Sequence, residues 1–406
     1  MLKRRLNNLT VIFIIFCSTS FYNFTILGPL QKIADIAGVG TILILILIQL
    51  VYSHETSNQR NFNWPVSLII FASFTSMFAA NLFHDQGFGH TLFAQRSLYF
   101  YLFYFLLHQL KVQVRDLEKI FIVMGLLYIA LYLAQYFLYP KIIFDAFIRE
   151  TRGTIRIYMP GAVYLTAAFF ISLQNFMRTN RFKYLVLLLG IFSIIIMNGG
   201  RQSMAIMALM VVLFLVFDRK VKSKLFLGML GMIGAFAIFL IFQDIFKALI
   251  MQSRSDANLG EEYVRIQAAQ YYLTEFYRNP LAYITGHGAY YAGTNYGKVI
   301  EHNILYHQYY LGDIGLIGNY VIFGSFFILG VLTICFRSLR LRIEEQYTYI
   351  KYIYLAIIIS LLTSGVFAQG DYIVFFGCLM YIVDVSRSKI KEEDQPQKNV
   401  LNIKNV

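Results

Sequence analysis

The sequence contains little charge, little cysteine and little proline. Only 14% of its 406 residues are charged, and it has three cysteines and six prolines. All three cysteines fall within apolar runs, and their spacing fits neither a metal site nor a disulfide framework. We therefore interpret them as core or lipid-facing side chains: Cys17, Cys335 and Cys378.

The motifs that mark metal and nucleotide chemistry are also missing. The sequence has no His-Glu-x-x-His pair, no clustered Asp motif and no Walker loop. Acidic residues are missing from the middle of every long apolar run, whereas a proton-coupled carrier generally needs one at mid-membrane depth. These absences leave metal and nucleotide chemistry without support, and they count against a transporter. Several acidic residues lie instead near the ends of such runs: Asp35, Asp244, Asp371 and Asp384.

Apolar and aromatic side chains dominate what is present. The chain is 58% hydrophobic and carries 38 Phe and 30 Tyr, a composition far from that of a soluble domain. Its apolar runs approach the ~20 residues that a helix needs to cross a bilayer, and polar segments separate them. We predict an all-α, polytopic integral membrane protein with about twelve transmembrane helices: 9–27, 33–52, 66–83, 96–110, 120–139, 158–177, 184–197, 201–217, 225–243, 314–336, 350–367 and 372–385.

The basic residues indicate how these helices are oriented. Lys and Arg number 35 against 22 Asp and Glu, which gives a net charge of +13. With twelve helices, the basic connections such as "DRKVKSK" and "RSLRLR" fall on one side, and positively charged loops resist translocation. That side is the cytoplasm, and it holds both termini. The basic pI therefore reports topology and does not argue for nucleic-acid binding.

Two predicted outer connections are longer than a turn. The second contains an amphipathic helix with an N-cap at Asn258 and an end at Asn279-Pro280. The predicted organisation is a membrane bundle at 1–243 with an outer loop at 140–157, a long extracytoplasmic loop at 244–313, three further spans at 314–386 and a polar cytoplasmic tail at 387–406.

Basic side chains on the predicted outer face need an explanation, because the positive-inside rule disfavours them. Either the neighbouring Asp145 and Glu150 partly neutralise them, or they form an outward-facing anion site. Guanidinium groups suit such a site, since they bind phosphate or carboxylate through paired donors. The basic residues of the first outer connection are Lys141, Arg149, Arg152 and Arg156.

Three further residues have both a functional and an ordinary interpretation. Arg201 follows Gly199-Gly200 at the outer mouth, where helix-start backbone donors favour an anion, but it could simply extend to lipid headgroups. Arg265 either binds an anion or pairs with Glu261 and Glu262 on its own helix. His302 is either an ordinary loop histidine or an acid–base group that titrates near neutral pH.

Several short motifs occur in one order between residues 152 and 330. "NGGRQS" lies at a span junction, an Arg-bearing helix ends in "RNPLAYITGHG", and "HN" precedes a "GLIG" that opens the next span. In order, spacing and topology these motifs resemble the bacterial O-antigen ligase and polymerase superfamily. The resemblance implies a GT-C-like membrane glycosyltransferase that acts on the outer face without metal or cofactor. Its donor is a glycan linked to undecaprenyl diphosphate.

The resemblance also implies roles for individual residues. Arg201 and Arg265 hold the donor diphosphate, and His302 activates or positions the acceptor. The remaining candidates for substrate binding or a shared acid–base role are Arg152, Arg156, Asn303, His287, His307 and Glu301.

Within this superfamily we favour a polymerase that joins lipid-linked repeat units of O-antigen or capsule in the bacterial cytoplasmic membrane. The reason is the interval between "HN" and "GLIG": eleven residues separate Asn303 from Gly315, and the interval is often shorter in the family. This departure counts against the ligase. The alternatives are a ligase that transfers the glycan to lipid A core or protein, and a lipid-linked oligosaccharide flippase or polysaccharide transporter. Expected partners are the lipid-linked oligosaccharide as donor and acceptor, membrane lipids and a chain-length regulator, and no nucleic acid.

Overall fold

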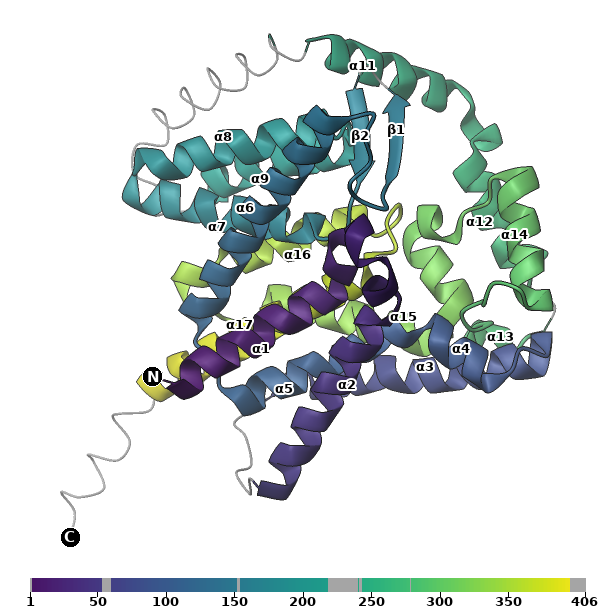
Figure 1. Cartoon of the computed structure of the whole chain (residues 1–406), viewed down its shortest axis with the longest axis horizontal. Helices are drawn as coiled ribbons and strands as arrows, with labels where there is room; N and C mark the ends of the chain where they lie inside the picture. The colour runs from purple at the N-terminus through teal and green to yellow at the C-terminus, as the bar shows by residue number, and fades with distance from the viewer. Residues whose placement is uncertain are drawn as a thin grey trace.

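The computed structural model describes residues 2–52, 60–151, 154–217, 240, 243–277 and 279–394 (Figure 1). Within them the regular structure is helical apart from one two-stranded hairpin. Arg152, most of the predicted ninth span and most of the predicted tail lie outside the described residues. The α-helices are α1 (Leu2–Ser18), α2 (Gly28–Tyr52), α3 (Asn63–His84), α4 (Phe88–Ala94), α5 (Phe103–Leu110), α6 (Val114–Leu138), α7 (Ala162–Thr179), α8 (Phe182–Met197), α9 (Arg201–Phe217), α11 (Gln243–Asn258), α12 (Val264–Thr274), α13 (Ala282–Thr285), α14 (Asn295–His307), α15 (Gly315–Arg340), α16 (Tyr349–Ser360) and α17 (Gly370–Asp394).

Several helices have the length and composition of membrane spans. In α2, apolar side chains such as Ile44, Leu47 and Leu50 stay exposed, which is unfavourable in water and suits contact with lipid. These apolar helices indicate a helical protein embedded in a membrane, as the composition predicts. Among the described residues, four segments are long and apolar enough to cross (Ile33–Val51, Asn63–His84, Val114–Leu138 and Leu311–Arg340), and two shorter apolar helices are Phe182–Met197 and Arg201–Phe217.

The predicted first span, 9–27, is not one continuous helix. α1 ends at Ser18, and each residue from Ser20 to Asn23 has a positive φ between 48° and 57°. Consecutive left-handed residues cannot continue a right-handed helix, so the chain turns here. Phe24 then forms an isolated bridge with Phe144. The turn brings Ser18 and Ser20 to the wall of a cavity that is described below.

The connection after α6 folds into a β-hairpin. β1 (Phe147–Thr151) pairs antiparallel with β2 (Thr154–Tyr158), and the β-branched Ile and Thr residues of both strands favour this conformation. The register sets Arg149 directly opposite Arg156. In Figure 1 the hairpin lies beside α8 and α9, far from the N-terminus.

Residues 264–307 form a helical unit made of α12, α13 and α14, drawn in green at the right of Figure 1. We call it the outer lobe because of this peripheral position in Figure 1. Its core of Tyr272, Tyr296 and Ile300 packs with residues near the start of α15. The helix predicted from Asn258 to Pro280 is shorter than expected. α12 begins only at Val264, because the extended backbone of the preceding tyrosine (φ −63°, ψ 121°) interrupts the helix.

The outer lobe is attached to α15 where the chain around Gly286 passes close to the chain around Gly324. We call this place the crossing. α15 begins at Gly315, where "GLIG" predicts the start of a span, and it is kinked at Gly324 (φ 72°, ψ −169°). Beside the kink, the backbone N–H of His287 donates to the Val321 carbonyl, and that of Gly288 donates to the Ile322 carbonyl, both at 2.8 Å. The kink therefore leaves carbonyl groups of α15 available to the outer lobe.

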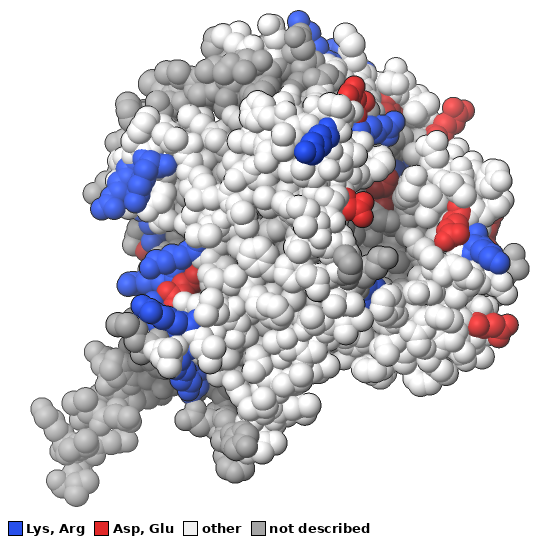
Figure 2. Space-filling view, viewed as in Figure 1, with Lys and Arg blue, Asp and Glu red and all other residues white. Residues whose placement is uncertain are grey.

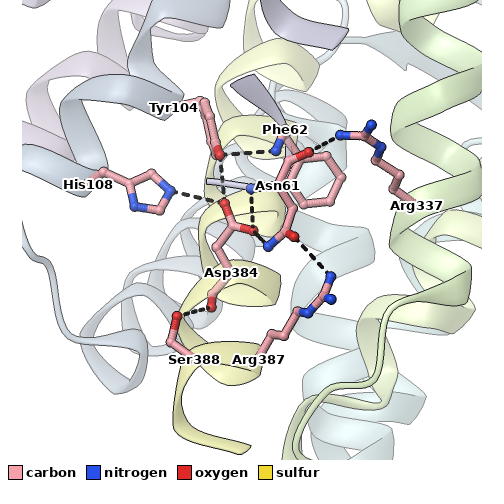
Figure 3. Close-up of polar contacts among 8 residues, drawn as sticks. All are labelled: Asn61, Phe62, Tyr104, His108, Arg337, Asp384, Arg387 and Ser388. Carbon is pink, nitrogen blue, oxygen red and sulfur yellow. Dashed lines mark hydrogen bonds and ion pairs between the residues drawn. The ribbon is translucent and has the colours of Figure 1, made fainter. Parts of the chain in front are cut away.

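A buried polar cluster joins α17 to α5 and to the segment before α3 (Figure 3). Asp384 is only 1% exposed. Its Oδ2 accepts the Tyr104 hydroxyl at 2.6 Å and lies 3.2 Å from His108 Nε2, and its Oδ1 accepts the backbone and side-chain N–H groups of Asn61. We call these four residues the Asp384 cluster. Two arginines donate to Asn61 and extend it: Arg337 and Arg387.

Candidate active site

Two of the predicted arginines lie on either side of a tight turn between α8 and α9. Gly199 has φ +63°, a left-handed conformation that favours glycine, and the Arg156 side chain packs 3.6 Å from where its Cβ would lie. Arg156 donates from Nε to the Asn198 carbonyl at 2.9 Å, and Arg201 is the first residue of α9. The structure thus brings Arg156 and Arg201 to the same turn.

A third arginine adds to this concentration of positive charge. Burial lowers the pKa of Arg156, and the charges of Arg149 and Arg201 lower it further. Like charges directly opposite each other on a hairpin are destabilising, and Arg149 lies opposite Arg156. We call Arg149, Arg156 and Arg201 the arginine cluster. Such a concentration of positive charge suits the anion site that the sequence predicts for this connection.

The cluster is only partly neutralised by described acidic residues. Arg201 forms an ion pair with Asp256 of α11 at 2.6 Å and a hydrogen bond to Ser253 at 2.9 Å. The side chains of Arg201 and Asp256 are both 26% exposed, so solvent screens this pair. An anion with more than one charge can therefore compete with Asp256 for the guanidinium.

A polar cavity of about 490 Å³ adjoins the arginine cluster. Asn198 and Tyr158 connect the two, because both line the cavity and both contact Arg156. The Arg156 guanidinium lies 4.8 Å from the centre of the Tyr158 ring, a cation–π contact. Other polar side chains in the lining come from distant parts of the chain: Ser18, Ser20, Asp35, Ser97, Tyr128, Gln369 and Asp371.

The cavity contains two carboxylates that were not among the predicted site residues. Asp35 pairs with Arg96 at 3.1 Å. Asp371, 6% exposed, accepts the backbone N–H of Gly161 at 2.8 Å and that of Tyr372 at 2.9 Å. The sequence marked both only as acidic residues near the ends of apolar runs. Polar residues gathered at the outer ends of several spans would have been the signal for this cavity.

The remaining predicted residues lie in the outer lobe, mostly exposed. Arg265 has its ion pair with Asp313, at 3.9 Å. His302 is exposed on α14, with ring centres 4.5 Å from Tyr306 and 6.0 Å from His307. Among the described residues, no contact joins Arg265 or His302 to Arg201. Glu301 is half-buried, His307 is exposed, and Asn303 is buried and donates to the Tyr271 hydroxyl.

His287 occupies a different setting from the other histidines of the outer lobe. It is 3% exposed, and its Nδ1 lies 3.0 Å from Nε2 of His84 at the end of α3. Burial and the neighbouring His84 lower the pKa of His287 to about 3, so the ring is neutral at neutral pH. His287 therefore fastens the outer lobe to α3 as a neutral hydrogen-bonding group.

The surface of the molecule is hollowed beside the outer lobe (Figure 2). Figure 2 shows the surface hollowed between the hairpin side of the molecule and the outer lobe, with acidic and basic side chains along the upper edge of the hollow. No protein-family model matches the chain, and no curated protein matches it. The functional argument therefore depends on the chemistry of these side chains.

Proposed function

We propose that the protein polymerises undecaprenyl-diphosphate-linked oligosaccharide repeat units into a surface polysaccharide such as O-antigen or capsule. In this proposal it is a metal-independent glycosyltransferase of the O-antigen ligase and polymerase superfamily, in the bacterial cytoplasmic membrane. The observation that supports it most is the arginine cluster at the edge of the polar cavity.

A lipid diphosphate matches the arginine cluster in charge and in geometry. Each guanidinium presents paired N–H donors to phosphate oxygens, and the two phosphates carry enough charge to offset several arginines. When a sugar is transferred from this donor, the diphosphate leaves with additional negative charge. Guanidinium groups already in place stabilise that charge without rearrangement.

The cavity matches the sugar part of the substrate. Its volume lies within the range of small-molecule pockets, ~300–1,000 Å³. Serine, asparagine, glutamine and carboxylate groups offer hydrogen bonds to sugar hydroxyls, and the Tyr128 and Tyr158 rings offer stacking surfaces. In the proposal, Arg265 and His302 contact the growing glycan from the outer lobe.

The proposed topology has twelve spans in a GT-C-like arrangement, with both termini cytoplasmic and the active site on the outer face. Figure 1 supports it, since the start of α1 and the end of α17 lie near each other and far from the hairpin. Arg4 of α1 also pairs with Asp116 at the start of α6, at 2.6 Å, so α6 runs from that end toward the hairpin.

A reporter domain fused after Asn295, at the start of α14, should read as extracytoplasmic in whole cells. The reason is that the outer lobe and the hairpin belong to the same face in the proposed topology. Fusion after Arg181, at the start of α8, provides the internal comparison and should read as cytoplasmic. A cytoplasmic reading after Asn295 contradicts the topology.

The function is tested by gel analysis of surface glycan in a strain that lacks the gene. We expect single repeat units there, and a full ladder when the wild-type gene is restored. The Arg156→Ala/Arg201→Ala double variant should give no ladder, because each lost charged hydrogen bond costs ~1.5–3 kcal/mol, or ~10-fold to 100-fold in affinity. Asp256→Asn should keep the ladder, since it removes only the competing carboxylate.

Arg181→Ala is the matched control, because Arg181 is exposed at the other end of α8. It should restore a full ladder. A full ladder from the double variant at normal expression would show that the arginine cluster is not the donor site. Long lipid-linked chains in the deletion strain would indicate a ligase in place of a polymerase.

A further inference from the structure

Asp371 is held in a fixed orientation by the backbone around it. It lies in the first turn of α17, where the helix dipole favours negative charge. One oxygen accepts the N–H of Gly161 and the other accepts the N–H of Tyr372. A carboxylate offers about four lone-pair positions. Asp371 therefore retains acceptor capacity toward the cavity that it lines.

The other carboxylate of the cavity is already neutralised. Asp35 forms its ion pair with Arg96, whereas the partners of Asp371 are backbone N–H groups. In the part of the chain that the structure describes, no basic side chain forms an ion pair with Asp371. Among the described residues, no cation therefore competes with a ligand for Asp371, whereas Arg96 does so for Asp35.

A second polar group of the cavity has no hydrogen-bond partner among the described residues. The side-chain oxygen of Asn198 is buried without a hydrogen-bond partner among the described residues. An amide oxygen can only accept, and the backbone carbonyl of the same residue already binds Arg156. The Asn198 oxygen thus needs a donor, and Asp371 has acceptor capacity left for one. A sugar with several hydroxyl groups satisfies both.

We propose that the cavity binds the terminal sugar of the acceptor chain and that Asp371 is the catalytic base that takes the proton of its attacking hydroxyl. This inference rests on the proposed function, in which the arginine cluster holds the donor. The acceptor oxygen forms a bond to the anomeric carbon of the donor as its proton passes to Asp371. The bond from that carbon to the diphosphate oxygen breaks, and its electron pair leaves with the diphosphate. Asp371 then releases the proton to water.

This assignment differs from the role that the sequence suggested for His302. His302 is exposed on α14, and its ring contacts are Tyr306 and His307. None of the described residues that line the cavity is a histidine. A base must lie within hydrogen-bond reach of the proton that it removes. Asp371 meets this condition for a hydroxyl in the cavity.

The test uses the full-length protein in lipid nanodiscs with two measurements. The first is binding of undecaprenyl diphosphate alone, and the second is polymer formation from lipid-linked oligosaccharide extracted from the deletion strain. Asp371→Asn should bind undecaprenyl diphosphate within about 2-fold of wild type, because the arginine cluster is intact. It should form polymer ~100-fold more slowly or worse, the usual effect of losing a general base.

Glu275→Gln is the matched control, since Glu275 is an exposed acid just after α12 in the outer lobe. It should leave both measurements unchanged. Ala162→Leu is a second variant that places a larger side chain in the cavity lining while keeping the carboxylate. It should lose polymer formation and keep undecaprenyl diphosphate binding, so the inference remains testable if Asp371→Asn folds poorly.

The outcomes separate this inference from the proposed function. Wild-type protein that neither binds undecaprenyl diphosphate nor forms polymer contradicts the proposed function itself. Wild-type protein that does both, together with Asp371→Asn or Ala162→Leu polymerising at the wild-type rate, overturns only the role of the cavity and Asp371.

Discussion

Replacement of Asp384 by alanine should destabilise the protein by about 3–5 kcal/mol, the usual cost of breaking a buried, hydrogen-bonded charge network. Alanine leaves the Tyr104 hydroxyl and the N–H groups of Asn61 without their acceptor in a buried site. Each unsatisfied donor costs about 1–3 kcal/mol. Because these donors come from α5 and from the segment before α3, α17 should lose its attachment to both. The measurement is the thermal unfolding midpoint of the detergent-purified protein. Unfolding is monitored as the loss of the monodisperse fraction on heating.

The asparagine variant at this position should fall between alanine and wild type. It keeps the shape of the side chain and one acceptor, but it turns an N–H₂ group toward a donor. Asp85→Asn is the control, because Asp85 is exposed at the end of α3 in a left-handed conformation that asparagine also tolerates. Equal midpoints for Asp384→Ala and wild type would falsify the view that this cluster stabilises the fold.

Replacement of Gly324 by alanine should detach the outer lobe from α15. The backbone of Gly324, at φ 72° and ψ −169°, lies in a region that is essentially restricted to glycine. A Cβ there would also lie 2.1 Å from the Ile284 carbonyl oxygen and 2.5 Å from the Gly286 nitrogen. Both contacts are with backbone, so no side-chain rotation relieves them. We expect a loss of several kcal/mol in the docking of the outer lobe, on the order of other severe steric substitutions.

Hydrogen exchange of residues 264–307 provides the measurement for this variant. Protection should fall across the outer lobe and persist in α6 and α17, because neither supplies an atom nearest to a Cβ at Gly324. Gly190→Ala is the matched control, because a Cβ at Gly190 of α8 meets nothing within 4 Å. That control should leave exchange in the outer lobe unchanged. Unchanged protection in Gly324→Ala means that the crossing does not hold the lobe.

Some elements could be predicted from the sequence because local features determine them. Apolar runs of the length of a membrane span predicted α3 and α6, and "NGGRQS" and "GLIG" located the starts of α9 and α15. The break after Ser18 was not predicted, because residues 19–27 contain no charge, proline or glycine that would mark the end of a helix. Their left-handed turn depends on tertiary contacts, including the bridge to Phe144.

The candidate site could likewise be predicted only in part from the sequence. Arg156 and Arg201 could be singled out as candidates because the positive-inside rule disfavours basic residues on an outer face. Asp371 could not be singled out from the sequence, because it lines the cavity only where β2 and α17 meet in the fold. Contacts between segments more than 200 residues apart, such as Gly161 with Asp371, leave no pattern along the chain.

The attachment of the outer lobe to α15 through main-chain atoms has a consequence for how such proteins diverge. The hydrogen bonds from His287 and Gly288 to α15 use only backbone groups, which every residue except proline supplies. Exposed side chains of the lobe, such as Lys298 and Tyr306, can therefore be exchanged without moving its position. Related proteins can therefore change which molecule this surface binds while the attachment of the lobe to α15 stays the same.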